Sequence, residues 1–174
     1  DSFEPGTGLN KSRKFTPKKI MDNNIIDIQC GKTFSMIINK ENELYSFGVN
    51  DLYQLGLSKS PPKINLYSNK FTCFDFVYPT KVDCFLKMKV KKIACGEGHC
   101  LAIINETKSN METVWSWGNN KFGQLGQGTS IKKSLPNPIN YLLEYTYMNF
   151  SEISCGGFHS LCLLKNKNSL DWIE

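Results

Sequence analysis

VWSWGNNKFGQLGQ (residues 114–127) matches LYSFGVNDLYQLGL (residues 44–57) position for position, without a gap. Both stretches begin with alternating apolar and polar residues, which is typical of a half-buried β-strand. Both then pass through Gly48 or Gly118 into a segment that ends in Gln-Leu-Gly. Glycine suits places where a strand ends sharply or where another backbone comes close. The repeated stretch therefore predicts a strand followed by a tight turn.

A second block, built around Cys-Gly, precedes each copy and occurs three times. It reads IIDIQCGKTFSMII (residues 25–38), VKKIACGEGHCLAI (residues 90–103) and FSEISCGGFHSLCL (residues 150–163). Cys30 and Cys95 are 65 residues apart, and Cys95 and Cys155 are 60 residues apart. Short strands that recur with polar hairpin loops between them predict a sheet-based repeat protein. A period above roughly 50 residues favours propeller blades over the shorter coils of a solenoid.

The two blocks divide the chain into repeats and insertions. Proline and aromatic residues mark the insertions, in Pro61-Pro62 with Phe71, Phe74, Phe76 and Tyr78, and in Pro136, Pro138 and residues 141–147. Residues 140–145 fit either a helical turn or an extra strand. The predicted units are a tail of a preceding repeat or linker (1–16), a first repeat (17–57), an insertion loop (58–78), a second repeat (79–128), and an inserted loop with an incomplete third repeat (129–174).

Composition is that of a soluble globular domain, with 40% hydrophobic and 21% charged residues among 174. The apolar runs are far shorter than a membrane span, so we expect no membrane partner. Seven cysteines without a CxxC pair argue against a disulfide framework or a zinc ribbon and favour a reducing, intracellular compartment, cytoplasmic or nuclear. The net charge of +5 is mild and scattered, so it supports DNA or other nucleic-acid contact only weakly. Asp1 in place of Met, with no leader behind it, predicts a piece of a longer chain.

The residues with possible chemistry all occupy repeated positions. His99 and His159 are equivalent, and neither has companions at metal-ligand spacing, so we expect each imidazole to hydrogen-bond nearby backbone. Cys100 is adjacent to His99, and neighbours in a strand point to opposite faces, which argues against a catalytic pair. Cys30, Cys95 and Cys155 are expected to be buried. The sequence therefore assigns no catalytic, cofactor-binding or metal-ligating residue and no cofactor.

The combination of Cys-Gly-x-x-His, Trp-Ser-Trp-Gly-Asn-Asn and Phe-Gly-Gln-Leu-Gly-Gln-Gly in one unit resembles the regulator of chromosome condensation (RCC) repeat family. The resemblance implies an all-β fold: a partial β-propeller, seven-bladed in the family, made of four-stranded antiparallel blades. This chain would hold about two and a half blades, with the remaining blades elsewhere in the parent chain or supplied by association with copies of itself. The residues assigned to the structural repeat motif are Cys30, Gly31, Gly48, Gln54, Leu55, Gly56, Cys95, Gly96, His99, Trp117, Gly118, Gly123, Gln124, Leu125, Gly126, Cys155, Gly156 and His159.

The first repeat departs from this pattern at three positions. Phe34 stands where the others have histidine, Phe47 where the second has Trp117, and Tyr53 where the second has Gly123. The position of Tyr53 is the least certain part of the match, because its glycine equivalent suits a left-handed backbone.

Function is sought in the loops, because a propeller presents its loops on two rims of a rigid scaffold. The aromatics of the insertions are expected either to anchor a partner or to cap the outer strand or the ring edge. The leading hypothesis is a non-catalytic protein-protein interaction module. The resemblance implies alternatives: a guanine nucleotide exchange factor for a small Ran-type GTPase, a chromatin-associated propeller, or a targeting domain of a larger ligase or kinase.

Overall fold

The computed structural model describes residues 19–21, 24–57, 75–107, 109, 111–145 and 147–166. The predicted tail in residues 1–16, most of the predicted insertion at 58–78, including Phe71 and Phe74, and the end of the third repeat lie outside the described residues. Within the described ranges, no helix is long and apolar enough to cross a membrane.

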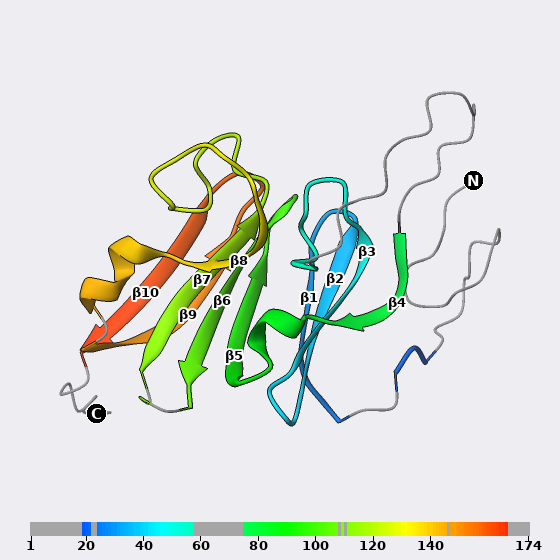
Figure 1. Ribbon diagram of the computed structural model, residues 1–174, viewed down its shortest axis with the longest axis horizontal. Coiled ribbons are helices and arrows are strands. Elements are labelled where there is room, and N and C mark those ends of the chain that lie inside the picture. The colour runs from blue at the N-terminus through cyan, green and yellow to red at the C-terminus, as the bar shows by residue number, and fades with distance from the viewer. Residues whose placement is uncertain are drawn as a thin grey trace, which may run out of the picture.

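The described chain forms three antiparallel sheets arranged side by side (Figure 1). We call them blade 1, blade 2 and blade 3 in chain order. This is the predicted all-β architecture of four-stranded blades, and the third blade is present in part. Blade 1 contains β1 (Ile25–Cys30), β2 (Phe34–Asn39), β3 (Leu44–Val49) and β4 (Asp75–Lys81); blade 2 contains β5 (Met88–Cys95), β6 (His99–Glu106), β7 (Glu112–Gly118) and β8 (Lys133–Pro138); blade 3 contains β9 (Met148–Cys155) and β10 (Ser160–Asn166).

The sequence repeat is also a repeat of strand register. The first hairpin of each blade ends in an equivalent pair: Cys30 opposite Ser35, Cys95 opposite Cys100, and Cys155 opposite Ser160. Each first strand also carries one extra residue at an equivalent position, where the register shifts, as in a β-bulge. These bulge residues are Ile26, Lys91 and Ser151.

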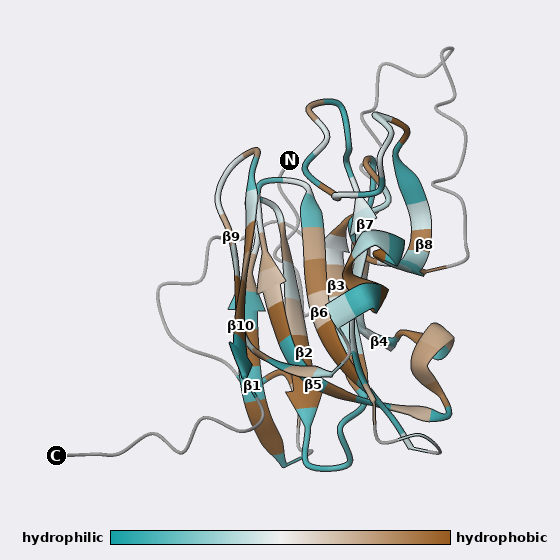
Figure 2. Ribbon diagram, turned by 90° about the vertical axis from the view of Figure 1, so that its left-hand side faces the viewer, coloured by the Kyte–Doolittle hydropathy of each residue, from teal (hydrophilic) through white to brown (hydrophobic). Residues whose placement is uncertain are grey.

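The core lies between the blades. One apolar cluster joins Met36 and Ile38 of blade 1 to Ile93 of blade 2, and a second joins Leu101 of blade 2 to Phe150 of blade 3. Figure 2 shows the apolar character of β6, which contributes to both clusters. Burial of apolar area contributes roughly 25 cal/mol per Å² to the free energy of folding. Because this area is buried between blades, each blade is stabilised mainly by its neighbours.

The fourth strands do not follow the predicted division into repeats and insertions. β4 begins inside the predicted insertion at 58–78 and continues past its end, and β8 lies inside the loop predicted after residue 128. These strands carry no repeat signature because each pairs on one side only, and an edge strand tolerates residues such as Pro136 and Pro138. Two 3₁₀ helices, η1 (Asp83–Phe85) and η2 (Asn140–Tyr145), follow them, so the helical alternative applies to residues 140–145.

Candidate binding surface at the blade junctions

The Gln-Leu-Gly turn after β7 is held by buried polar side chains. Asn120 Oδ1 accepts a hydrogen bond from the Leu125 N–H (3.0 Å), and Gln124 Oε1 accepts one from the Phe122 N–H (2.9 Å). Ser116 Oγ donates to the Leu125 carbonyl (2.8 Å). Sequence reasoning missed the asparagine and the serine, although both recur in the aligned stretch. Blade 1 repeats these three bonds with Asn50 and Leu55 (3.0 Å), Gln54 and Leu52 (2.8 Å), and Ser46 and Leu55 (2.9 Å).

The same turn requires a left-handed backbone, which confirms the expectation for Tyr53. Gly123 has φ of 78° and Tyr53 has φ of 63°. The Tyr53 ring lies beneath Lys132 of blade 2, whose Nζ is 4.6 Å from the ring centroid. A cation over an aromatic face is attractive, and this contact offsets part of the cost of a side chain in the left-handed region.

The main-chain carbonyl of each turn glutamine is the attachment point of the next blade. Gln54 O accepts hydrogen bonds from Trp117 Nε1 (2.9 Å) and Cys100 Sγ (3.4 Å), both in blade 2. Gln124 O accepts one from Ser160 Oγ of blade 3 (2.7 Å), and Ser160 is the equivalent of Cys100. The Gln54, Gln124 and Trp117 positions of the motif therefore connect blades as well as form turns.

The Cys-Gly-x-x-His turn packs its ring onto the glycine. A Cβ atom on Gly96 would overlap the His99 ring, and one on Gly156 would overlap the His159 ring. In blade 1 the Phe34 ring lies over Gly31 in the same way. Phenylalanine can therefore replace histidine here, because the shared role is that of a flat ring over a glycine.

His99 also makes a polar contact that phenylalanine cannot make. Its Nε2 lies 3.0 Å from Ser160 Oγ in blade 3, so a hydroxyl of the next blade is a partner of this imidazole. His99 is completely buried, and the loss of hydration lowers its pKa below the ordinary value. His159, in the last described blade, is exposed.

The repeated cysteines differ in burial. Cys95 and Cys155 are partly buried, and burial raises the pKa of Cys155 to about 12, so its thiol stays protonated. The prediction that Cys30 is buried is wrong: Cys30 is exposed, on the same uncovered face of β1 as Ile26 and Ile28. The six cysteines of the described ranges are free thiols, and within those ranges no group of three His, Cys, Asp or Glu side chains is placed to hold a metal.

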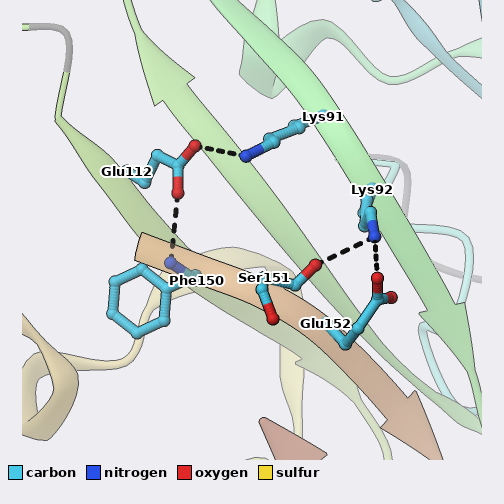
Figure 3. A network of polar contacts seen from close by, with 6 residues as sticks. All are labelled: Lys91, Lys92, Glu112, Phe150, Ser151 and Glu152. Atoms are coloured by element: carbon cyan, nitrogen blue, oxygen red, sulfur yellow. Dashed lines mark hydrogen bonds and ion pairs between the residues drawn. The ribbon is translucent and has the colours of Figure 1, made fainter. Parts of the chain in front are cut away.

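A polar network joins blade 2 to the bulge of blade 3 (Figure 3). Glu112 accepts from Lys91 (2.5 Å) and, through its other oxygen, from the Phe150 N–H (3.1 Å). Lys92 donates to the carbonyl of Ser151 (2.9 Å) and to Glu152. Backbone groups that the bulge leaves outside the regular ladder thus find partners on the neighbouring blade. At the first junction the equivalent donor, the Val90 N–H, instead bonds the Asn42 carbonyl (3.0 Å).

The turns after the first strands meet in an open recess of about 490 Å³. Across the first junction, Lys32 and Glu97 form an ion pair on its rim (2.7 Å). Glycines and backbone form much of the lining, which gives a concave surface rather than a set of reactive groups. The lining residues are Cys30, Gly31, Lys32, Cys95, Gly96, Glu97, Cys155, Gly156 and Gly157.

The described aromatics of the insertions differ in what their rings contact. Tyr78, Tyr145 and Tyr147 are exposed. Tyr141 is also exposed, but its ring lies against Gly128, where a Cβ atom would be 2.8 Å from the phenol oxygen. Tyr141 therefore covers the turn at Gly128.

Comparison with known proteins agrees with this geometry. The family model for the regulator of chromosome condensation (RCC1) repeat matches residues 41–103 and 112–163, and a second RCC1 repeat model matches residues 90–124. The chain belongs to the RCC1 repeat family. It is an RCC1-type repeat domain that holds part of a β-propeller.

RCC1-repeat relatives include ligases. The chain is 29% identical over 167 residues to the probable E3 ubiquitin-protein ligase HERC6 of Homo sapiens, covering 92% of this chain and 14% of the relative. It is 30% identical over 161 residues to an RCC1 domain-containing protein of Dictyostelium discoideum, covering 84% of this chain and 30% of the relative.

Solved RCC1-type structures share the fold. Prp20p of Saccharomyces cerevisiae superposes with a TM-score of 0.67 at 23% identity, over 83% of this chain and 32% of that one. Human WBSCR16 gives 0.59 at 20% identity, over 83% and 32%. The chain thus spans about a third or less of the length of these four proteins.

Proposed function

We propose that this chain is a non-catalytic protein-interaction module that presents its turns and loops to another protein. The observation that carries the proposal is that repeated and variable residues of each repeat have different roles. The repeated polar residues form hydrogen bonds within a turn or to the next blade, as with Gln54 O and its two donors in blade 2. The rim residues between them, such as Lys32 and Glu97, differ from blade to blade. A rigid scaffold with variable rims is suited to recognition.

The relatives support this proposal by what is stated of them. Prp20p is described by its binding properties to Gsp1p and histones, and Kap60 has been solved bound to yeast RCC1 (Prp20). Both are statements about a protein of which this chain matches about a third.

The test is capture of partners on the immobilised full chain, followed by crosslinking and mass spectrometry. We expect a reproducible set of proteins on the folded chain that is absent from heat-unfolded chain at equal loading. Crosslinks to the partner should fall on the turns that follow β1, β5 and β9 or on the loops after β3 and β7. Equal recovery on folded and unfolded chain would reject the proposal.

A second candidate is nucleotide exchange on a small Ran-type GTPase, favoured by the binding of Gsp1p stated for Prp20p. Exchange requires no reactive side chain from this protein, only preferential binding to the nucleotide-free GTPase. Release of fluorescent GDP should accelerate when catalytic amounts of the full chain are added. A folded chain that leaves the release rate unchanged for such GTPases would exclude exchange and leave the interaction module standing.

A third candidate is a targeting domain within a larger ligase, favoured by the HERC6 match, in which this chain spans 14% of the relative. Deleting these repeats from the full-length protein should abolish modification of selected substrates but leave self-modification unchanged. The six free thiols of the described ranges support an intracellular location, cytoplasmic or nuclear, which microscopy of the tagged full-length protein would test.

A further inference from the structure

Two exposed phenylalanines meet at the junction between blade 2 and blade 3. Phe122 lies in the turn after β7, and Phe158 lies in the turn before β10. Their ring centroids are 5.1 Å apart with the planes at 61°, an edge-to-face arrangement. The two residues are nevertheless 62% and 48% exposed. Solvent therefore reaches a contiguous aromatic surface made by two blades.

The first junction shows that the fold does not need this pair. There the position of Phe122 is taken by Leu52, and that of Phe158 by Gly98. A Cβ atom on Gly98 would be 2.7 Å from Leu52 Cδ1, so one leucine on a glycine closes that junction. The second junction thus exposes two large rings where a smaller pair suffices, and a cluster of exposed apolar side chains marks interaction sites.

The charge around the pair is positive. Lys121 Nζ lies 5.7 Å from the Phe122 ring. Lys132 lies over Tyr53 and follows Ile131, whose carbonyl accepts a hydrogen bond from Asn120 Nδ2 in the turn of Phe122 (3.0 Å). The equivalent turns at the first junction carry two carboxylates: Asp51 accepts from the neutral Gln54 Nε2 (3.0 Å), and Glu97 pairs with Lys32 (2.7 Å). At the second junction Lys121 takes the position of Asp51 and Gly157 that of Glu97, so neither carboxylate has an equivalent beside the phenylalanine pair.

We propose that Phe122, Phe158, Lys121 and Lys132, which we call the aromatic-basic edge, bind an acidic segment of another protein that carries an apolar anchor. The anchor packs against the phenylalanine pair, as large apolar side chains do at interface centres. Carboxylates on either side of the anchor pair with the lysines and steer the encounter. This inference rests on the interaction function proposed above and adds the chemistry of the partner.

The test is selection from a display library of random 12-residue peptides on the immobilised full chain. We expect enriched peptides to combine Asp or Glu with a nearby Leu, Phe or Trp. The matched variant carries Phe122→Leu with Phe158→Gly, which gives the second junction the residues of the first. It should bind the enriched peptides at least about tenfold more weakly, because loss of a central anchor costs more than 1.4 kcal/mol.

Two further measurements complete the test. Lys121→Glu should weaken the acidic peptides, and their binding to the unchanged chain should weaken as salt rises. Circular dichroism and thermal unfolding should show that both variants fold. Enriched peptides without acidic residues, or equal binding by the double variant, would overturn the aromatic-basic edge while leaving protein interaction in place. A selection that enriches no peptide would also overturn it, and the partner-capture experiment would decide the broader function independently.

Discussion

Gly118 and Gly123 lie five residues apart, and both have positive φ angles, 97° and 78°. Their surroundings differ. A Cβ atom on Gly118 would be 2.5 Å from the carbonyl oxygen of Gly98, whereas one on Gly123 would meet nothing within 4 Å. The cost of replacing Gly123 is therefore conformational, while that of replacing Gly118 is also steric.

We expect Gly123→Ala to lower the free energy of unfolding by about 1 kcal/mol, the usual cost of a left-handed non-glycine residue. Gly118→Ala should cost several times more, because His99 pairs with Gly118 and the backbone beside it cannot retreat without breaking the β6–β7 ladder. Urea denaturation of both variants gives the comparison. Equal losses would show that packing against Gly98 is unimportant.

At the residue scale the sequence indicated the backbone conformation of one turn but not the contacts around it. The alignment of Tyr53 with Gly123 indicated a left-handed position, and the structure has one at both. The alignment could not show that Lys132 covers the Tyr53 ring, because that contact joins residues of different blades. Likewise, Phe122 and Phe158 belong to repeated turns, and their exposure depends on how two blades meet.

The β2–β3 hairpin contains a carboxylate with three hydrogen-bond donors. Glu43 accepts from Lys81 Nζ (2.5 Å), from Asn39 Nδ2 (2.9 Å) and from the Tyr45 hydroxyl (2.9 Å). These bonds, led by that from Lys81, lower the pKa of Glu43 from its ordinary value of 4.5 to about 2. In the unfolded chain the carboxyl binds its proton more tightly than in the folded one.

Glu43 should therefore stabilise the fold above pH 4.5, and this contribution should disappear as the pH falls toward 2. Glu43→Gln should remove this part of the stability that is lost in acid. The curve of unfolding free energy against pH should therefore be flatter in this window. Glu41→Gln, in the same hairpin loop, serves as the control for the removal of one negative charge. A wild-type slope in the Glu43 variant would contradict the assignment.

The bulge network of blade 3 makes a separate prediction for Glu112. Glu112→Ala removes the acceptor of the Phe150 N–H at the blade junction, and an unsatisfied buried donor costs about 1–3 kcal/mol. Glu112→Gln keeps an acceptor and loses only the ion pair with Lys91, which is partly exposed and contributes less. Chemical denaturation should rank the alanine variant well below the glutamine variant. Equal losses of unfolding free energy in the two variants would show that the ion pair, and not the Phe150 N–H bond, accounts for the effect.

At the scale of elements, strands with a repeated signature were predictable and the others were not. The Cys-Gly spacing indicated the first hairpin of each blade. The fourth strands escaped prediction because β8 contains Pro136 and Pro138 and pairs only with β7. The bulges gave no sequence signal, since Ile26, Lys91 and Ser151 have unrelated side chains and share only a position in the register.

In the whole molecule, the same position is buried or exposed according to whether a described blade covers it. Ile28 of β1 is 66% exposed, whereas its equivalent Ile93, at the first junction, is 4% exposed. Leu161 of β10 is 64% exposed, whereas its equivalent Leu101 is 2% exposed. Both outer faces of the described blades therefore present apolar residues of the kind that form the junctions.

We expect this 174-residue chain, taken alone, to associate through these faces as its concentration rises. Sedimentation equilibrium should show the association, and Ile28→Lys with Leu161→Lys should reduce it without lowering stability. Ile93→Lys, at a covered position, should instead destabilise the fold. A wild-type chain that remains monomeric throughout the concentration series would contradict this prediction.

The bond from one blade to the turn glutamine of the preceding blade has a consequence for how such chains can change in length. Gln54 lies at the rear of one repeat and its donors Trp117 and Cys100 in the next, and Gln124 and Ser160 stand in the same relation. Blade 2 thus carries donors to the blade before it and an acceptor for the blade after it. A gene segment that encodes one such repeat can be copied in tandem. The copy then encodes both the donors and the acceptor that a new blade junction requires.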